Sequence, residues 1–203
     1  MKTKKPILII CEGDSEYAYV QELNRYLNEQ RSDMVLVPKN AGGGYFTNIR
    51  QYCRALKTKR NGCTFVLADE DIYFRDDNHT GEQYEKEKDL VPPFVFQRWN
   101  FEEFLLLHCP REIVLEWIKT AELSGHLTAP KHSQEFLPLF QQFCENHKES
   151  LGFSLPYEKG DMPFELTAGR IATLVANSAE FQHPHTDLVN ILNLPNPTTL
   201  PAQ

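Results

Sequence analysis

The sequence predicts an α/β fold in which a parallel sheet with flanking helices is followed by an all-helical C-terminal lobe. Apolar runs of strand length recur through the first half of the chain, and stretches with helical spacing of apolar residues lie between them. Continuous apolar runs indicate strands buried on both faces, and their alternation with helices indicates a parallel sheet. Further along, only helical patterns remain. We therefore expect an α/β domain over 1–108 and a helical extension over 109–203.

Local signals predict each element of the first domain. The expected strands are Pro6–Cys11, Met34–Pro38, Cys63–Ala68 and Phe94–Phe96. Asp14 and Ser15 are typical N-cap residues, so a helix is expected from Asp14 to about Gln30. A second helix is expected from about Phe46 to Lys57. The charged stretch from Arg75 to Asp89 predicts either an exposed helix or a mobile loop.

Helical periodicity dominates the rest of the chain. The expected helices are Phe101–His108, Arg111–Leu123, Gln134–Glu145, Pro163–Ala176 and Thr186–Leu192. Pro110 separates the first two, because proline interrupts a helix interior. We expect this helical lobe to pack on the flank of the sheet.

Composition excludes several classes of protein. The five cysteines are scattered and form no C-x-x-C pair, which argues against a disulfide framework and against a structural zinc site built on cysteines. The net charge of −7 gives no global attraction to nucleic acid, although bound metal ions invert the charge of a local site. No apolar stretch approaches the roughly 20 residues that a membrane span requires. We expect a cytoplasmic protein without a membrane partner.

Acidic residues follow two of the predicted strands directly. Glu12 comes after the first strand, and Asp69 and Asp71 come at the end of the third. In an extended segment Asp69 and Asp71 would leave the same face, and the first and third strands of a doubly wound sheet are commonly neighbours. Three hard oxygen donors in one crevice suit Mg²⁺ or Mn²⁺. The alternative is structural: Asp14 and Glu16 favour the helix dipole, and the Asp69–Asp71 segment begins a polar loop.

A third acidic segment opens a very apolar helix. Glu102 and Glu103 lie near the expected N-terminus of the helix Phe101–His108. Carboxylates at that position are favourable for the helix dipole alone, and they are also candidates for the same metal site.

These segments together resemble the Toprim family, in particular its small RloB-like and OLD-type nuclease branches. The segment Glu12-Gly13-Asp14-Ser15-Glu16 resembles the E-G-x-S/T-E opening of that family, and Asp69-Glu70-Asp71 resembles its D-x-D. The segment from Phe101 to His108 is similar to F-E-x-W-L-L-L-H, Tyr157-Glu158-Lys159 to Y-x-K, and the segment from His183 to Val189 to the closing N-P-x-T motif.

The resemblance implies a role for each matching residue. It implies that Glu12 is a general acid or base or a metal ligand, that Asp69 and Asp71 hold Mg²⁺ (or Mn²⁺), and that Glu102 contributes to the same or a second metal. Glu16 and Gly13 would be auxiliary residues, and Lys159 would neutralise charge in the transition state.

The resemblance implies a Mg²⁺-dependent nuclease that acts on DNA or RNA in a phage-defence or restriction-associated system. It also implies an ATPase partner, and it is compatible with a homo-oligomer. The alternative is a catalytically degenerate Toprim-fold adaptor, since Phe104 stands where the family has Trp and His183 where it has Asn. Receiver and haloacid-type phosphatase folds distribute their acids in a different order and do not fit.

Overall fold

The computed structural model of the chain describes residues 5–30, 32–57, 63–75, 77–153 and 160–192. The chain divides into two compact units. Unit 1 comprises Met1–Val95 and Glu158–Glu165, and unit 2 comprises Phe96–Tyr157 and Leu166–Gln203. The boundary that the sequence predicts at residue 108 therefore falls inside unit 2.

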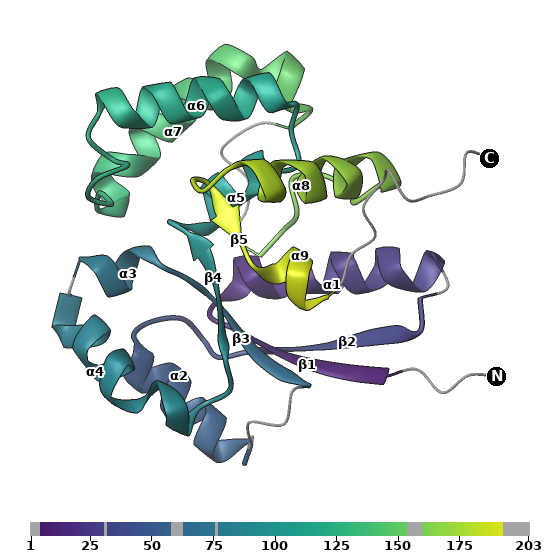
Figure 1. Cartoon of the computed structure of the whole chain (residues 1–203), viewed down its shortest axis with the longest axis vertical. Coiled ribbons are helices and arrows are strands. Elements are labelled where there is room, and N and C mark those ends of the chain that lie inside the picture. Colours follow the sequence, from purple (N-terminus) through teal and green to yellow (C-terminus); the bar gives the residue numbers. More distant parts are fainter. Residues whose placement is uncertain (1–4, 31, 58–62, 76, 154–159, 193–203) are drawn as a thin grey trace. The chain divides into compact units, whose positions relative to one another are not determined.

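Unit 1 begins with the predicted alternation of strands and helices (Figure 1). In chain order its first elements are β1 (Lys5–Cys11), α1 (Asp14–Glu29), β2 (Met34–Asn40), α2 (Phe46–Ala55) and β3 (Thr64–Asp69). The charged stretch that follows contains α3 (Asp71–Phe74), the 3₁₀ turns Asp77–His79 and Lys88–Leu90, and α4 (Thr80–Glu87). Of the two structures expected for this stretch, the helix is the one formed. The strand β4 (Phe94–Arg98) comes next.

The sheet has the strand order β2-β1-β3-β4-β5. β1 pairs in parallel with β2 and with β3, so that Cys11 lies opposite Asn40 on one side and Leu67 on the other. The last pair is antiparallel, with Arg98 of β4 opposite His185. The sheet is therefore mixed, whereas the sequence predicted a parallel one. Because β1, β2 and β3 run in parallel, their carboxyl ends meet at one edge.

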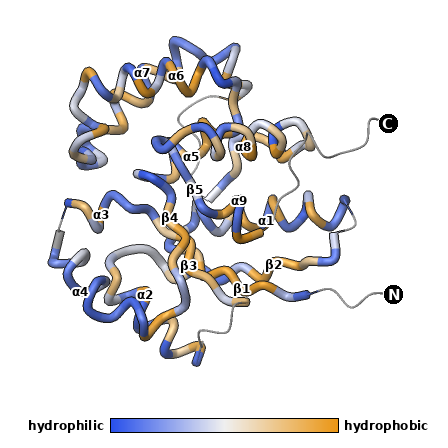
Figure 2. The backbone as a smooth tube through the Cα atoms, viewed as in Figure 1, coloured by the Kyte–Doolittle hydropathy of each residue, from blue (hydrophilic) through white to orange (hydrophobic). Residues whose placement is uncertain are grey.

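The core of unit 1 explains why these segments fold as they do. Ile9, Ile10 and Leu67 in the central strands are at most 1% exposed, and Tyr19 and Leu23 of α1 are fully buried. Central strands buried on both faces produce the continuous apolar runs seen in the sequence. Figure 2 shows β1 and β3 largely in the hydrophobic colours and α4 mostly in the hydrophilic ones.

Unit 2 is built mainly from helices. Its elements are α5 (Phe101–Leu106), α6 (Arg111–Leu123), α7 (Ser133–Leu151), α8 (Ala168–Glu180), β5 (His185–Thr186) and α9 (Leu188–Ile191), together with the end of β4. The prediction of an all-helical second half is wrong at β5. A strand of two residues is too short to show an alternating pattern, so the sequence does not predict it.

Aromatic side chains and one amide hold unit 2 together. The buried Trp117 ring meets Phe140 edge-to-face at 5.0 Å between ring centroids. The buried Asn177 side chain of α8 donates from Nδ2 to the carbonyl oxygens of Leu107 and Cys109, both at 3.0 Å. These carbonyls follow α5, where the helix leaves them without intrahelical partners. Among the described residues, no helix combines the length and the apolar character needed to cross a membrane.

Candidate functional site

The structure brings Glu12 and Asp69 together at the edge where β1 and β3 end. The Glu12 backbone N–H donates to the Leu67 carbonyl oxygen at 2.9 Å, which extends the pairing of the two strands by one residue. The Asp69 backbone N–H donates to Oε2 of Glu12 at 3.0 Å. The predicted adjacency of the first and third strands is thus confirmed, and it places the Glu12 carboxylate beside Asp69.

Two groups near this edge have raised pKa values, in part because of its carboxylates. The Tyr73 hydroxyl lies close enough that its pKa is raised well above the usual range, first by burial and then by the charge of Glu12, with Asp69 also contributing. Burial, followed by the charge of Glu16, likewise raises the pKa of the Cys11 thiol. Carboxylates that repel other anions in this way attract a cation to the same edge.

Glu16 and Gly13 organise the start of α1. Oε2 of Glu16 accepts the Gly13 backbone N–H at 3.0 Å, as the third helical residue does in a capping box. Glu16 is only 5% exposed. Gly13 has an extended backbone, but a Cβ there would lie 3.3 Å from that same carboxylate oxygen. Both residues serve the site indirectly, by fixing the turn that carries Glu12.

Asp71 does not lie where its spacing predicted. β3 ends at Asp69, Glu70 has helical backbone angles, and Asp71 opens α3. Asp69 and Asp71 are therefore not two residues of one extended segment, and the prediction that they share its face is wrong. Oδ2 of Asp71 pairs with Nη1 of Arg75 one helical turn later at 2.6 Å, with both side chains 13% exposed or less.

A glycine loop adjoins Glu12 from the end of β2. Gly42, Gly43 and Gly44 have φ angles of 85°, 85° and 101°, which favour glycine over any residue with a Cβ. The Gly43 backbone N–H donates to the Glu12 carbonyl oxygen, and a Cβ on Gly42 or Gly43 would meet no atom within 4 Å. The glycines are therefore required by backbone conformation, and they leave open space beside the site.

Two predicted residues lie outside the described part of unit 1. Glu102 lies in the first turn of α5 in unit 2 and is half-buried. Lys159 lies outside the described residues. Of the acidic pair at the start of α5, Glu103 has the more unusual surroundings.

Glu103 is fully buried and receives four hydrogen bonds on its carboxylate. Trp117 Nε1 donates to Oε1 at 2.7 Å, and Asn100 Nδ2 donates to Oε2 at 3.0 Å. Nε2 of His183 lies 2.9 Å from Oε1, and Nε2 of His126 lies 3.0 Å from Oε2. Four donors match the four lone-pair positions that a carboxylate offers.

This environment keeps Glu103 ionised. Burial alone would raise the pKa of its carboxyl, but the hydrogen bonds from His126 and His183 outweigh burial and hold the pKa below its usual value. Asn100 also accepts the Glu103 backbone N–H on Oδ1 at 3.0 Å and so caps α5. The buried charge is therefore stabilised by oriented donors rather than by solvent.

The proton on His126 can be assigned from its neighbours. The Lys131 backbone N–H donates to Nδ1 of His126 at 3.1 Å, so Nδ1 carries a lone pair. The proton of the neutral ring is then on Nε2, from which it is donated to Glu103. The ring also stacks on Phe136 at 4.8 Å between centroids.

Glu103, His126 and His183 have the side-chain types and the spacing of a metal site. One ligand atom from each lies within 4.8 Å of the other two, and within the described part of the chain no other three His, Cys, Asp or Glu side chains are gathered this closely. A single hydrogen bond contributes about 0.5–1.5 kcal/mol, whereas Zn²⁺ binding in small zinc domains provides about 10–16 kcal/mol. A metal ion at this cluster would replace the hydrogen bonds between Glu103 and the two imidazoles.

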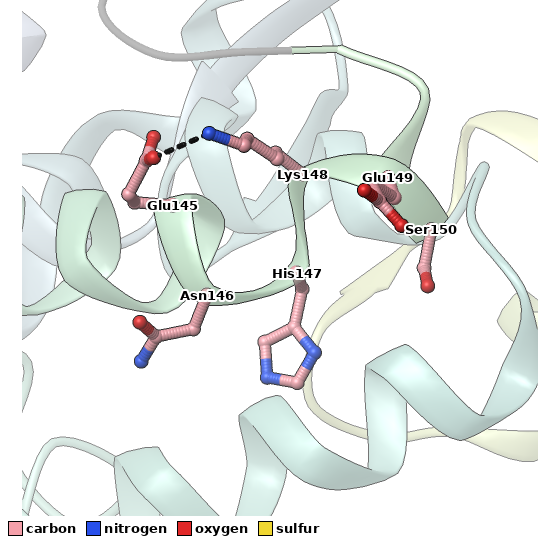
Figure 3. A pocket seen from close by; sticks show the side chains of 6 residues that line it. All are labelled: Glu145, Asn146, His147, Lys148, Glu149 and Ser150. Atoms are coloured by element: carbon pink, nitrogen blue, oxygen red, sulfur yellow. Dashed lines mark hydrogen bonds and ion pairs between the residues drawn. The ribbon is translucent and has the colours of Figure 1, made fainter.

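A shallow hollow on unit 2 is unrelated to either group of residues. Figure 3 shows its lining residues at the C-terminal part of α7. Its volume is about 210 Å³. It is lined by Glu145, Asn146, His147, Lys148, Glu149 and Ser150, and Glu145 pairs with Lys148 at 2.7 Å. Six consecutive residues of one helix supply no converging chemistry.

Comparison with known proteins finds no significant match to this chain. The chain matches no protein-family model, and no curated protein and no solved structure is significantly similar to it.

Proposed function

We propose that the protein is a Mg²⁺-dependent phosphodiesterase of the Toprim type that cleaves nucleic acid, with Glu12 and Asp69 at the centre of its site. The observation that carries the proposal is the contact between the Glu12 carboxylate and the Asp69 backbone N–H at the ends of adjacent parallel strands. Functional groups of open α/β sheets lie beyond the carboxyl ends of the strands, at the point where the strand order reverses. In this sheet that point adjoins β1 and β3.

The chemistry of the donor set supports a magnesium ion, although Glu12, Asp69 and Asp71 do not have ligand atoms gathered within 4.8 Å of one another as their expected convergence in one crevice requires. Glu12, Asp69 and Asp71 offer carboxylate oxygens, which Mg²⁺ prefers, and one or two such ligands suffice because the ion retains several waters. The guanidinium of Arg75 lies against Asp71, so the ion would compete with Arg75 for that carboxylate. When bound, Mg²⁺ would polarise the phosphate and stabilise charge on the attacking and leaving oxygens.

The residues of the chain have distinct tasks in this proposal. The Asp69 N–H fixes the orientation of the Glu12 carboxylate, which then accepts a proton from the attacking water. Asp69 and Asp71 hold the ion. The open space beside Gly42 and Gly43 admits the substrate backbone next to Glu12. Glu102 and Lys159 keep the metal-binding and charge-neutralising roles that the resemblance implies, and the defence setting and the ATPase partner belong to the same proposal.

The test is a cleavage assay on DNA and RNA with Mg²⁺ or Mn²⁺. We expect Glu12→Gln and Asp69→Asn to lower the cleavage rate by at least about 100-fold, the range for loss of a positioned acid–base group. The matched control is Glu82→Gln, because Glu82 is an exposed carboxylate of α4 paired only loosely with Lys86 at 3.6 Å. Equal cleavage by all variants would refute the proposal.

A degenerate adaptor is the second candidate function. One observation favours it: the guanidinium of Arg75 pairs with the Asp71 carboxylate, as expected if that carboxylate binds no metal. An adaptor would cleave neither DNA nor RNA with either metal, and a partner ATPase would bind it equally with and without Mg²⁺.

A further inference from the structure

We propose that Glu103, His126 and His183 form a second metal site, in unit 2, which takes Zn²⁺ and is independent of the strand-end acids. Two imidazole nitrogens and one carboxylate are ligands that Zn²⁺ accepts readily, whereas Mg²⁺ prefers oxygen alone. The chain brings the three residues together from α5, from the segment after α6 and from the segment before β5.

The separations of the ligand atoms fit one ion. Each histidine Nε2 lies 2.9 or 3.0 Å from a different oxygen of Glu103. Bonds of about 2.0–2.2 Å from Zn²⁺ to nitrogen and oxygen leave ligand atoms about 3.3–3.6 Å apart at tetrahedral angles. An ion seated between the two rings and the carboxylate therefore requires the ligand atoms to separate slightly and the Lys131 backbone N–H to reorient.

The surroundings already support the carboxylate as a ligand. Trp117 and Asn100 each donate to a Glu103 oxygen, and neither hydrogen bond has to break when a metal replaces the two histidine contacts. Hydrogen bonds of this kind orient carboxylate ligands and contribute to metal affinity. Phe136 stacks on His126, and Trp99 lies 5.4 Å from His183 between ring centroids, so aromatic rings border both imidazoles.

Binding at His126 requires its ring proton to move. In the metal-free arrangement Nε2 holds the proton and Nδ1 accepts the Lys131 N–H. Coordination through Nε2 shifts that proton to Nδ1, and the ring stays neutral. The protonated Nδ1 and the Lys131 N–H would then be two donors facing each other, so the Lys131 N–H must turn to water. The proposal thus predicts a specific local change at Lys131 on metal binding.

His183 lies at the accessible side of the site. Its side chain is 12% exposed, whereas those of Glu103 and His126 are fully buried. Three protein ligands leave one position for water or another small ligand, as in zinc sites that are not closed by a fourth residue. We place that position beside His183.

The test uses the full-length protein, stripped of metal, titrated with Zn²⁺ alone by calorimetry. We expect one ion per chain, with affinity lowered more than about 100-fold by His183→Gln and by His126→Gln. His185→Gln is the matched control, because His185 lies outside the cluster and contacts the Phe181 carbonyl oxygen at 3.1 Å. Millimolar Mg²⁺ should not compete.

A second measurement needs no variant and separates this site from the proposed nuclease centre. Amide hydrogen exchange at Lys131 should accelerate on addition of Zn²⁺, and Glu12→Gln should bind Zn²⁺ as tightly as the unaltered chain. The proposal is overturned if Zn²⁺ does not bind, if binding survives His183→Gln, or if exchange at Lys131 is unchanged in the Zn²⁺-loaded protein.

Discussion

Oε2 of Glu12 accepts the backbone N–H of Asp69 at 3.0 Å, so a side chain joins the ends of β1 and β3 where their main-chain pairing stops. The contact gives Glu12 two separable roles. One needs only an oxygen acceptor and supports the fold, and the other needs a negative charge and supports the proposed chemistry.

Glu12→Gln and Glu12→Ala should separate these two roles. Glutamine keeps the oxygen that accepts the Asp69 N–H, and alanine removes it, so Glu12→Ala should lose about 1 kcal/mol more unfolding free energy than Glu12→Gln. Both substitutions should abolish most metal-dependent cleavage. Denaturant unfolding and the cleavage assay measure the two effects. Equal stability of the two variants would show that the contact contributes nothing to the fold.

Arg75→Gln should lower the Mg²⁺ concentration needed for half-maximal cleavage. The Arg75 guanidinium and the metal compete for the same carboxylate of Asp71, so removal of the guanidinium should increase apparent metal affinity several-fold. Arg25→Gln is the control, because Arg25 pairs with Glu22 and Glu29 on the surface of α1. A higher Mg²⁺ requirement in Arg75→Gln would instead mean that Arg75 holds Asp71 in its binding position.

The adjacent residues Glu102 and Glu103 should respond very differently to the same substitution. Glu103→Gln replaces an oxygen that accepts hydrogen bonds with an NH₂ group that faces buried donors, at a cost of about 2–4 kcal/mol of unfolding free energy. Glu102 lies in the same helix turn but is only half-buried. Glu102→Gln should therefore change the unfolding free energy by no more than about 0.5 kcal/mol. Urea unfolding of the metal-free variants is the measurement, and similar losses in both would contradict the burial difference.

The stability of the protein should decrease on mild acidification because of His108. Burial lowers the pKa of this imidazole to about 3, with the charge of Arg170 also contributing, so the folded state keeps it neutral. The unfolded chain binds a proton below about pH 6.5, and each pH unit below that value removes up to about 1.4 kcal/mol of unfolding free energy. Stability is complete above pH 6.5 and is lost progressively toward pH 3.

His108→Asn should flatten this dependence. Asparagine retains a donor for the Leu105 carbonyl oxygen, which His108 Nδ1 contacts at 3.3 Å, but it does not titrate. Measurements between pH 7 and pH 5 avoid most carboxylate titration, so the difference in slope between the two proteins reports on His108 alone. Parallel slopes would show that another group causes the acid sensitivity.

The sequence predicted those parts of the fold that local signals determine. The strands β1 and β3 were recognised because burial on both faces leaves an uninterrupted apolar run, and the predicted helix Arg111–Leu123 matches α6 at both ends. The adjacency of Glu12 and Asp69 followed from the usual order of doubly wound sheets. Asp71 was misplaced because the sequence does not show that the chain becomes helical at Glu70.

The cluster around Glu103 could not be predicted from sequence. Three of its four donors come from positions 14, 23 and 80 residues further along the chain, and no local pattern relates such distant residues. The first turn of a helix also gives too little periodicity to show which of Glu102 and Glu103 points inward. The only sequence signal was an acidic pair, and dipole arguments explained it equally well.

The position of His183 has a consequence for the synthesis of the protein. Because this donor follows Glu103 by 80 residues, a nascent chain exposes the carboxylate long before its last partner leaves the ribosome. Burying an ionised side chain while one of its donors is missing is costly, so the polar centre of unit 2 assembles only after His183 has been synthesised. Chains truncated before His183 should be recognised by proteases rather than accumulate as folded fragments.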